Sequence, residues 1–198
     1  MEIAIHSLNA CRDTLGQLTT LLVEVVADGG SVSFMAPLAP EAAGAFWEHA
    51  LAAAGRGERV VLGAWDGDVL AGTVTLIVDC PPNQPHRAEI GKLMTRPAYR
   101  GRGIAARLMT HVEACAVRLA KTLLVLDTAT EGGAAPLYER FGFTFAGEIP
   151  DYALKPHGGL TGTKLYWKRL SLPASLAGGL PLPSTLPSTA PSTPAAPS

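Results

Sequence analysis

The chain has 198 residues, of which 47% are hydrophobic, and this is enough apolar sequence for the core of one globular domain of ordinary size. Its 16 basic and 17 acidic residues give a net charge of −1, which argues against non-specific binding of nucleic acid, because such binding requires clustered Lys and Arg. No segment approaches the roughly 20 apolar residues of a membrane span, and no signal peptide is visible, so we expect a cytoplasmic protein without nucleic-acid or membrane partners.

The N-terminal part of the chain alternates strand-like and helix-like patterns. Residues 2–6 alternate polar and apolar side chains, as a half-buried strand does. Residues 11–27 carry Leu and Val at helical spacing, and residues 40–54 fit a second helix with proline in its first turn. Residues 59–65 and 69–78 are rich in β-forming residues and flank an Asp-Gly-Asp turn, so they are predicted to form a hairpin.

The second half of the domain continues this alternation. Its predicted elements are a strand at 87–95, a helix at 103–120, a strand at 122–127, a short helix at 134–141 and two strands at 143–148 and 163–168. The order β-αα-ββ-β-α-β-α-β-β predicts an α/β fold whose sheet contains both strand directions.

The last segment, residues 171–198, differs in composition from everything before it. It contains seven prolines, many small residues and no charged residue. Such a segment buries too little apolar surface to offset its ordering entropy. We therefore predict one domain over residues 1–170, followed by a disordered tail.

A glycine-rich loop precedes the long predicted helix. The segment Arg100-Gly101-Arg102-Gly103-Ile104-Ala105 lies between a strand and that helix. Glycine lets the backbone approach a ligand and turn its N–H groups outward, and a helix N-terminus adds free N–H groups and partial positive charge. The segment is predicted to bind a diphosphate, although short glycine patterns also occur in ordinary connections.

The same glycines allow a second interpretation. Gly101, Gly103 and Ala106 satisfy the G-x-G-x-x-A spacing of dinucleotide-binding folds, and Asp127 ends the next predicted strand, where a ribose-binding acid belongs. In those folds the first glycine comes directly after the strand, whereas residues 96–100 intervene here. Two helices and a hairpin also precede the motif, so the sequence disfavours a nicotinamide-binding protein.

Two motifs resemble those of the GNAT acetyltransferases. Arg100, Gly103 and Ala105 match the acetyl-CoA motif R/Q-x-x-G-x-G/A, and residues 134–143 resemble the element A-x-x-L-Y-x-x-x-G-F. The resemblance implies a single GNAT-like α/β domain, with a mixed, mostly antiparallel sheet whose central parallel strands splay apart between flanking helices. It also implies an N-acetyltransferase that uses acetyl-CoA as co-substrate and acts on the primary amine of a small molecule.

A closer resemblance concerns residues 29–35, 87–94 and 126–128, which look like the tabtoxin-resistance branch of that family. Members of that branch acetylate a β-lactam amino-acid toxin, which implies an amino-acid-like toxin or antibiotic as acceptor and a role in antibiotic resistance. One position departs from the wider family. Glu131 stands where many members carry an Asn that contacts the cofactor, so main-chain groups are expected to serve instead.

The resemblance implies three catalytic residues, Glu89, Asp127 and Tyr138. Glu89 and Asp127 are expected on adjacent parallel strands, where a carboxylate could accept the proton of the acceptor ammonium or hold its charge. The Tyr138 hydroxyl is expected beside the coenzyme sulfur, as a proton donor at neutral pH. Other roles stay open: an ion pair of Glu89 with Arg87 or Lys92, a cap or turn role for Asp127, and packing alone for Tyr138.

The binding residues implied by the resemblance form two groups. The acetyl-CoA contacts are Leu93, Met94, Thr95, Arg100, Gly101, Arg102, Gly103, Ile104 and Ala105, with a main-chain N–H near Leu93 or Met94 facing the thioester carbonyl. The connection after the first helix often covers the acceptor site in this family, which adds Phe34 and Met35 to Glu89 and Asp127 as substrate contacts. The His and Cys spacings match no metal site, so no metal is expected.

Two other functions are compatible with these motifs. A protein N-terminal or lysine acetyltransferase would share them, and would need an open groove instead of a closed pocket. A non-catalytic acyl-CoA-binding sensor would share the fold without requiring Glu89, Asp127 and Tyr138 together. A monomer and a homodimer fit the sequence equally.

Overall fold

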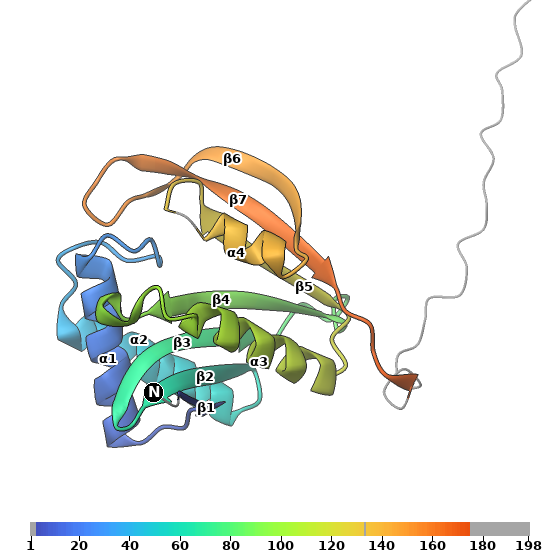
Figure 1. Cartoon of the computed structure of the whole chain (residues 1–198), viewed down its shortest axis with the longest axis horizontal. Coiled ribbons are helices and arrows are strands. Elements are labelled where there is room, and N and C mark those ends of the chain that lie inside the picture. The colour runs from blue at the N-terminus through green and yellow to red at the C-terminus, as the bar shows by residue number, and fades with distance from the viewer. Residues whose placement is uncertain (1–2, 133, 175–198) are drawn as a thin grey trace, which may run out of the picture.

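Figure 1 shows the chain as a computed structural model, which describes residues 3–132 and 134–174. Its elements are β1 (Ala4–Ser7), α1 (Arg12–Ala27), α2 (Pro40–Gly55), β2 (Arg59–Asp66), β3 (Val69–Ile77), β4 (Arg87–Thr95), the short 3-10 turn η1 (Pro97–Tyr99), α3 (Ile104–Arg118), β5 (Leu123–Ala129), α4 (Ala135–Arg140), β6 (Thr144–Leu154) and β7 (Leu160–Arg169). The order of strands and helices is the predicted one. Only the end of β6 and the start of β7 lie far from the predicted bounds.

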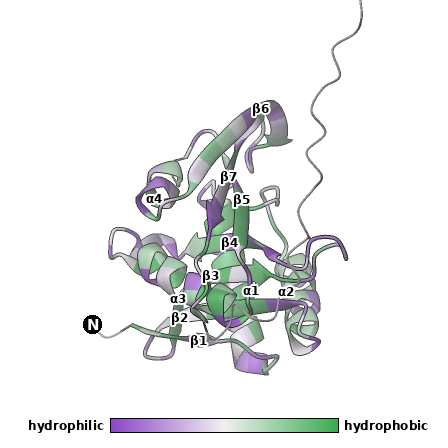
Figure 2. Cartoon of the chain, turned by 90° about the vertical axis from the view of Figure 1, so that its right-hand side faces the viewer, coloured by the Kyte–Doolittle hydropathy of each residue, from purple (hydrophilic) through white to green (hydrophobic). Residues whose placement is uncertain are grey.

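The strands form one sheet of seven, in the order β1-β2-β3-β4-β5-β7-β6. Every neighbouring pair is antiparallel except β4 and β5, which are parallel. Figure 2 shows α1 and α2 on one face of this sheet and α3 on the other. The predicted fold, a single α/β domain with a mixed, mostly antiparallel sheet and a central parallel pair, is confirmed.

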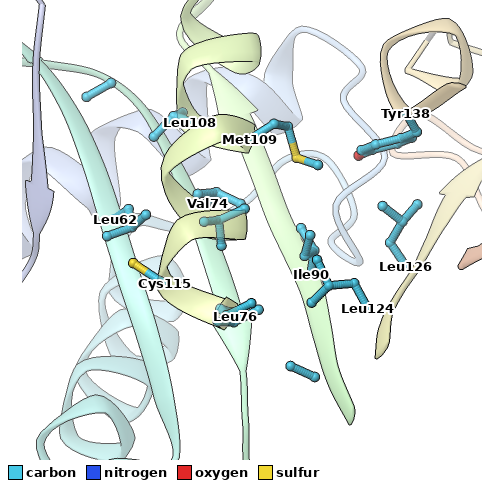
Figure 3. Packing of buried hydrophobic residues seen from close by; sticks show 14 of the residues in the cluster. Leu62, Val74, Leu76, Ile90, Leu108, Met109, Cys115, Leu124, Leu126 and Tyr138 are labelled. Atoms are coloured by element: carbon cyan, nitrogen blue, oxygen red, sulfur yellow. The ribbon is translucent and has the colours of Figure 1, made fainter. Parts of the chain in front are cut away.

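Two hydrophobic cores lie on opposite faces of the sheet. One packs α1 and α2 against β2 and β3, around the fully buried Trp47. The other packs α3 and α4 against the central strands, and Figure 3 shows Leu108 and Met109 of α3 lying over Val74 and Ile90. The apolar residues of α3 recur every three to four positions, so one face of the helix can bury them all. The two cores hold β4 rigidly between the helix layers.

Truncating Trp47 tests the first core. We expect Trp47→Ala to lower the free energy of unfolding by about 3–5 kcal/mol, because a fully buried side chain leaves a cavity. Urea denaturation followed by circular dichroism measures the loss. The control is Leu160→Ala, at a position 53% exposed, with an expected change within about 0.5 kcal/mol. Equal losses in the two variants would contradict the packing.

The last two strands correct the prediction from sequence. The sequence predicted strands over 143–148 and 163–168, but β6 and β7 run much further toward their connecting turn. The part of β6 that was not predicted contains Pro150. This proline lies in a register shift between Ile149 and Ala153, on a strand at the edge of the sheet. Edge strands and bulges tolerate proline because no ladder hydrogen bond needs its missing N–H.

The C-terminal boundary of the domain lies just beyond β7. The Leu170 amide donates to the Thr122 carbonyl at 2.9 Å, and the Leu170 side chain packs against the α3-side core. The predicted disordered tail falls almost entirely on residues 175–198, which lie outside the described residues, and it stays a prediction.

Within residues 3–132 and 134–174, no helix has both the length and the hydrophobicity of a membrane span. Three or more potential His, Cys, Asp or Glu ligands do not gather at any point of these residues. Cys11, Cys80 and Cys115 are all free thiols.

Candidate active site

The ladder between the two parallel strands is short. It contains three pairs, Arg87 with Leu123, Ala88 with Leu124 and Glu89 with Val125. Beyond that point β5 stays paired with β7 along its whole length, and the β5–β7–β6 part of the sheet separates from β4 (Figure 1). Main-chain groups of β4 that face β5 therefore have no strand partner after Glu89. They are free to bind an extended ligand.

A bulge in β4 lies beside this opening. Thr75 pairs with Gly91 and Thr73 pairs with Met94, so Lys92 and Leu93 together oppose one residue of β3. Lys92 has a φ of 51°, an unusual value for a lysine. Bulges change the direction of side chains and interrupt a ladder. The predicted contact of a main-chain N–H with the thioester carbonyl falls at this bulge.

The two candidate carboxylates share one face of the sheet. Glu89 is paired with Val125, and Asp127 lies two residues further along β5, where strand alternation returns the side chain to the same face. The Thr163 hydroxyl donates to Asp127 Oδ2 at 3.0 Å. Glu89 Oε2 lies 3.5 Å from Arg87 Nη1, so the ion pair that the sequence left open is present. The structure thus brings both carboxylates to the point where the strands part.

Lys92 joins this group through its long side chain. Its Nζ donates to Ser33 Oγ at 3.2 Å and lies 6.0 Å from the ring centroid of Phe34 and 5.6 Å from that of Phe46. Burial lowers the pKa of Lys92, and the negative charges of Asp127 and then Glu89 act in the opposite direction. Phe34, one of the residues predicted to contact the acceptor, therefore packs against the Lys92 ammonium. Met35, which was predicted with it, is 44% exposed.

Tyr138 approaches the opening from α4, on the α3 side. Its side chain is 6% exposed, and its ring packs against Phe143 and Tyr166 with centroids 6.0 and 6.2 Å apart. Burial, with a smaller effect of the Asp127 charge, raises the pKa of Tyr138 to about 12. Figure 3 shows the hydroxyl pointing away from α4 toward Met109 and α3. The residue is therefore a packed tyrosine with a protonated hydroxyl, close enough to Asp127 for that charge to act on it.

The glycine loop follows β4 and η1 directly. Gly101 and Gly103 have φ values of 75° and 74°, and a Cβ added at either position would meet no atom within 4 Å. Gly103 is the N-cap of α3, whose first-turn N–H groups have no helical acceptor. The loop therefore offers open space, a close backbone approach and free donors, and these features fit a diphosphate.

The arginine side chains of this loop contact protein groups. Arg100 Nη1 donates to Asp28 Oδ2 at the end of α1, and the Arg102 guanidinium lies 5.0 Å from the ring centroid of Tyr99. Buried side chains anchor the backbone on either side of the loop, with Met94 in one core and Ile104 in the other. The main chain is thus the better-placed part of the loop for ligand binding.

Two connections meet above the parting strands. The Ala36 amide of the α1–α2 connection donates to the Pro156 carbonyl of the β6–β7 turn at 2.8 Å. His157 Nε2 of the same turn lies 3.0 Å from the Ala27 carbonyl. Figure 1 shows the two segments approaching each other at one end of the molecule. The two hydrogen bonds join the β6–β7 turn to the end of α1 and to the α1–α2 connection.

Glu131, the departure from the family pattern, lies beside this contact. Its carboxylate accepts a hydrogen bond from Lys155 Nζ at 2.9 Å, and both side chains are largely exposed. The side chain is therefore engaged in an ion pair with the β6–β7 turn.

A separate hollow lies far from these residues. It has a volume of about 800 Å³ and is lined by α1, β1 and the β2–β3 turn, including His6, Arg12 and Asp68. It is wide open and contains none of the residues at the parting strands. The candidate site is therefore defined by the interrupted ladder and its convergent polar groups.

Three residues of the site were not predicted as site residues. Ser33 lies within residues 29–35, which the resemblance singled out, but it was not named as a contact. Thr163 carries no sequence signal, because it acts through one hydrogen bond to a residue distant in the chain. Lys92 was considered only as an ion-pair partner of Glu89. A bulge that redirects a lysine follows from the pairing of β3 with β4, which the sequence does not show.

Together, the fold and the site define an α/β domain that offers a ligand the space between two parting parallel strands and a glycine loop at a helix N-terminus. This chain belongs to the acetyltransferase (GNAT) family, which matches residues 31–143. That match covers more than half of the chain and includes β4, the glycine loop, α3 and Tyr138.

Known proteins of this family share parts of the sequence and nearly all of the fold. The N-acetyltransferase YedL of Escherichia coli K12, itself uncharacterized, is 31% identical over 97 residues, which cover 47% of this chain and 58% of that relative. An N-acetyltransferase structure from Staphylococcus aureus Mu50 has a TM-score of 0.73 at 18% identity, covering 86% of this chain and all of its own. The structure of yncA from Salmonella typhimurium, with its cofactor acetyl-CoA, gives 0.70 at 18% identity, covering 87% and 96%.

Proposed function

We propose that this protein is an acetyl-CoA-dependent N-acetyltransferase that moves an acetyl group to the primary amine of a small molecule by direct attack. One observation carries the proposal: β4 and β5 part directly after Glu89, on the face that also carries Asp127, and β4 continues from there through a β-bulge toward the glycine loop at the start of α3. Membership of the acetyltransferase family and the acetyl-CoA in the Salmonella structure support the choice of co-substrate.

The chain's own groups would hold acetyl-CoA along β4. The amides from Gly101 to Ala105 would bind its diphosphate at the start of α3, where the helix dipole favours negative charge. Leu93, Met94 and Thr95 would present main-chain groups to the pantetheine arm. Bound acetyl-CoA supplies a thioester whose carbonyl carbon is open to attack by an amine.

Four parts of the chain would assist the transfer. Asp127 takes a proton from the acceptor ammonium, because one of its oxygens accepts from Thr163 and the other accepts from no described side chain. An N–H at the β4 bulge donates to the carbonyl oxygen as negative charge develops there. The Tyr138 hydroxyl gives its proton to the leaving sulfur and regains one from the nitrogen, which loses its second proton as the amide forms. Glu89, paired with Arg87, contributes negative charge that attracts a cationic acceptor.

The contact between the α1–α2 connection and the β6–β7 turn supports a small acceptor. A peptide would have to pass between these segments, but hydrogen bonds of Ala36 with Pro156 and of His157 with Ala27 join them. A protein N-terminal or lysine acetyltransferase is the second candidate, and it requires this contact to open. The resemblance to the tabtoxin-resistance branch adds amino-acid-like toxins and antibiotics to the acceptors that we propose.

An amine screen with acetyl-CoA, followed by thiol release, tests the proposal. It should contain amino acids, amino-acid antibiotics, polyamines and short peptides. We expect saturable turnover with small amines. Turnover confined to peptides would defeat the small-molecule assignment, and coenzyme A binding without turnover for any amine would favour a non-catalytic sensor.

Gly103→Asp tests how the coenzyme is held. Aspartate tolerates positive φ and is a good N-cap, so α3 should keep its stability. The new carboxylate would accept hydrogen bonds from the first-turn N–H groups of α3, which we propose bind the diphosphate. We expect the Kd for coenzyme A to rise by about 10- to 100-fold, as for the loss of charge-assisted hydrogen bonds. Isothermal titration calorimetry measures the change.

The matched control is Gly67→Asp in the β2–β3 turn. Gly67 also has a positive φ of 58° and open space around a Cβ, but it lies in a hairpin turn and caps no helix. Its substitution should leave coenzyme A binding unchanged. Equal affinity in both variants would show that the diphosphate binds elsewhere.

A further inference from the structure

Lys92 is a half-buried cation without a carboxylate beside it. Its Nζ contacts the Ser33 hydroxyl and the faces of Phe34 and Phe46. No carboxylate in the described part of the chain lies within the 4.0 Å ion-pair distance of this nitrogen. Lys168, also over an aromatic ring, has Glu113 at 2.7 Å, so the two lysines differ in this respect.

The charged form of Lys92 is energetically unfavourable in this position. Removing an ammonium from water is unfavourable unless an opposite charge or hydrogen bonds replace the water. The two rings and one hydroxyl compensate in part. Burial lowers the pKa of Lys92, which indicates that the compensation is incomplete. An anionic group placed against Nζ would complete it.

The position of Lys92 specifies where that anion would lie. The bulge in β4 turns the side chain toward the α1–α2 connection, which carries Ser33. Asp127, across the opening on β5, is near enough for its charge to act on Lys92. Positive and negative groups therefore stand on either side of the acceptor position, and an acceptor with both charges would match them.

We propose that Lys92 binds a carboxylate of the acceptor, so that the enzyme selects zwitterionic, amino-acid-type amines over polyamines and neutral amines. Lys92 donates one N–H to Ser33 Oγ, which leaves its remaining N–H groups and the Ser33 O–H to donate to the carboxylate oxygens. Asp127 then faces the ammonium of the same molecule. This inference rests on the proposed function, because it assigns the acceptor of the same reaction.

The test compares acceptors that differ only in the carboxylate. Free L-amino acids, their carboxamides and the corresponding decarboxylated amines (lysine, lysinamide and cadaverine, for example) are assayed with acetyl-CoA. We expect kcat/KM for the best amino acid to exceed that for its carboxamide by about 10- to 100-fold, as for a hydrogen bond to a charged group. In Lys92→Met this ratio should fall to about one, and Lys92→Arg should restore much of it.

Lys168→Met is the matched control, because it removes a lysine from an aromatic ring on another part of the sheet, and the ratio should stay at its original value. A wild-type enzyme that prefers carboxamides or polyamines would overturn the inference while leaving acetyl transfer established. A preference for the amino acid over its carboxamide that persists in Lys92→Met would also overturn the inference. The wild-type comparison decides the matter alone if that variant fails to fold. Absence of transfer to every amine would overturn both the inference and the proposed function.

Discussion

Asp127→Asn is expected to lower kcat by about 10²- to 10⁴-fold, the range for loss of a positioned general base. Asparagine keeps the size of the side chain and can still accept the Thr163 hydroxyl at 3.0 Å, but it cannot take a proton from the acceptor ammonium. Coenzyme A binds along β4 and the glycine loop in our proposal, so its Kd should stay nearly constant. Steady-state kinetics and calorimetry on the same preparations measure the two quantities.

Two variants show whether the effect belongs to Asp127. Glu89→Gln should lower kcat much less, because the Glu89 carboxylate is paired with Arg87 at 3.5 Å. Thr163→Val removes the hydrogen bond that orients Asp127 without removing the base, so its effect should lie between the two. A larger loss in Glu89→Gln than in Asp127→Asn would reverse the assignment of the base.

Most of the fold was predictable because its signals are local. The strand at 87–95 was predicted with its observed bounds, and a proline follows two residues beyond it. The hairpin of β2 and β3 followed from an Asp-Gly-Asp turn, in which Gly67 has a φ of 58°. The true extent of β6 could not be predicted, because tolerance of Pro150 depends on its place at the sheet edge.

The candidate site was predictable only in part, for a similar reason. Glu89, Asp127 and Tyr138 lie in segments that resemble the family. The structure places Glu89 and Asp127 on one face of the sheet where β4 and β5 part, and Tyr138 close enough to Asp127 for its charge to act. The conformation of Lys92 depends on a mismatch in the pairing of two strands. Its neighbour Ser33 is 59 residues away in the chain. Neither fact leaves a local pattern, so the contacts of Lys92 could be found only in three dimensions.

Tyr138→Phe is expected to lower kcat by about 10²-fold or more while the Kd for coenzyme A changes little. Burial raises the pKa of Tyr138 to about 12, and the charge of Asp127 adds to the shift, so the hydroxyl keeps its proton at every pH of a normal assay. Phenylalanine preserves the ring contacts with Phe143 and Tyr166 and removes only the O–H. Stopped or continuous thiol-release assays at saturating substrates measure the loss.

Tyr166→Phe is the control that separates proton donation from packing. Tyr166 belongs to the same aromatic cluster, but its hydroxyl donates to Glu139 at 3.0 Å and takes no part in the proposed chemistry. Its loss should leave kcat nearly unchanged. Because a raised pKa keeps the acid form to higher pH, Tyr138 should produce no alkaline fall in rate below about pH 11. Equal turnover of Tyr138→Phe and wild type would remove this residue from the mechanism, as would an alkaline limb near neutral pH that disappears in the variant.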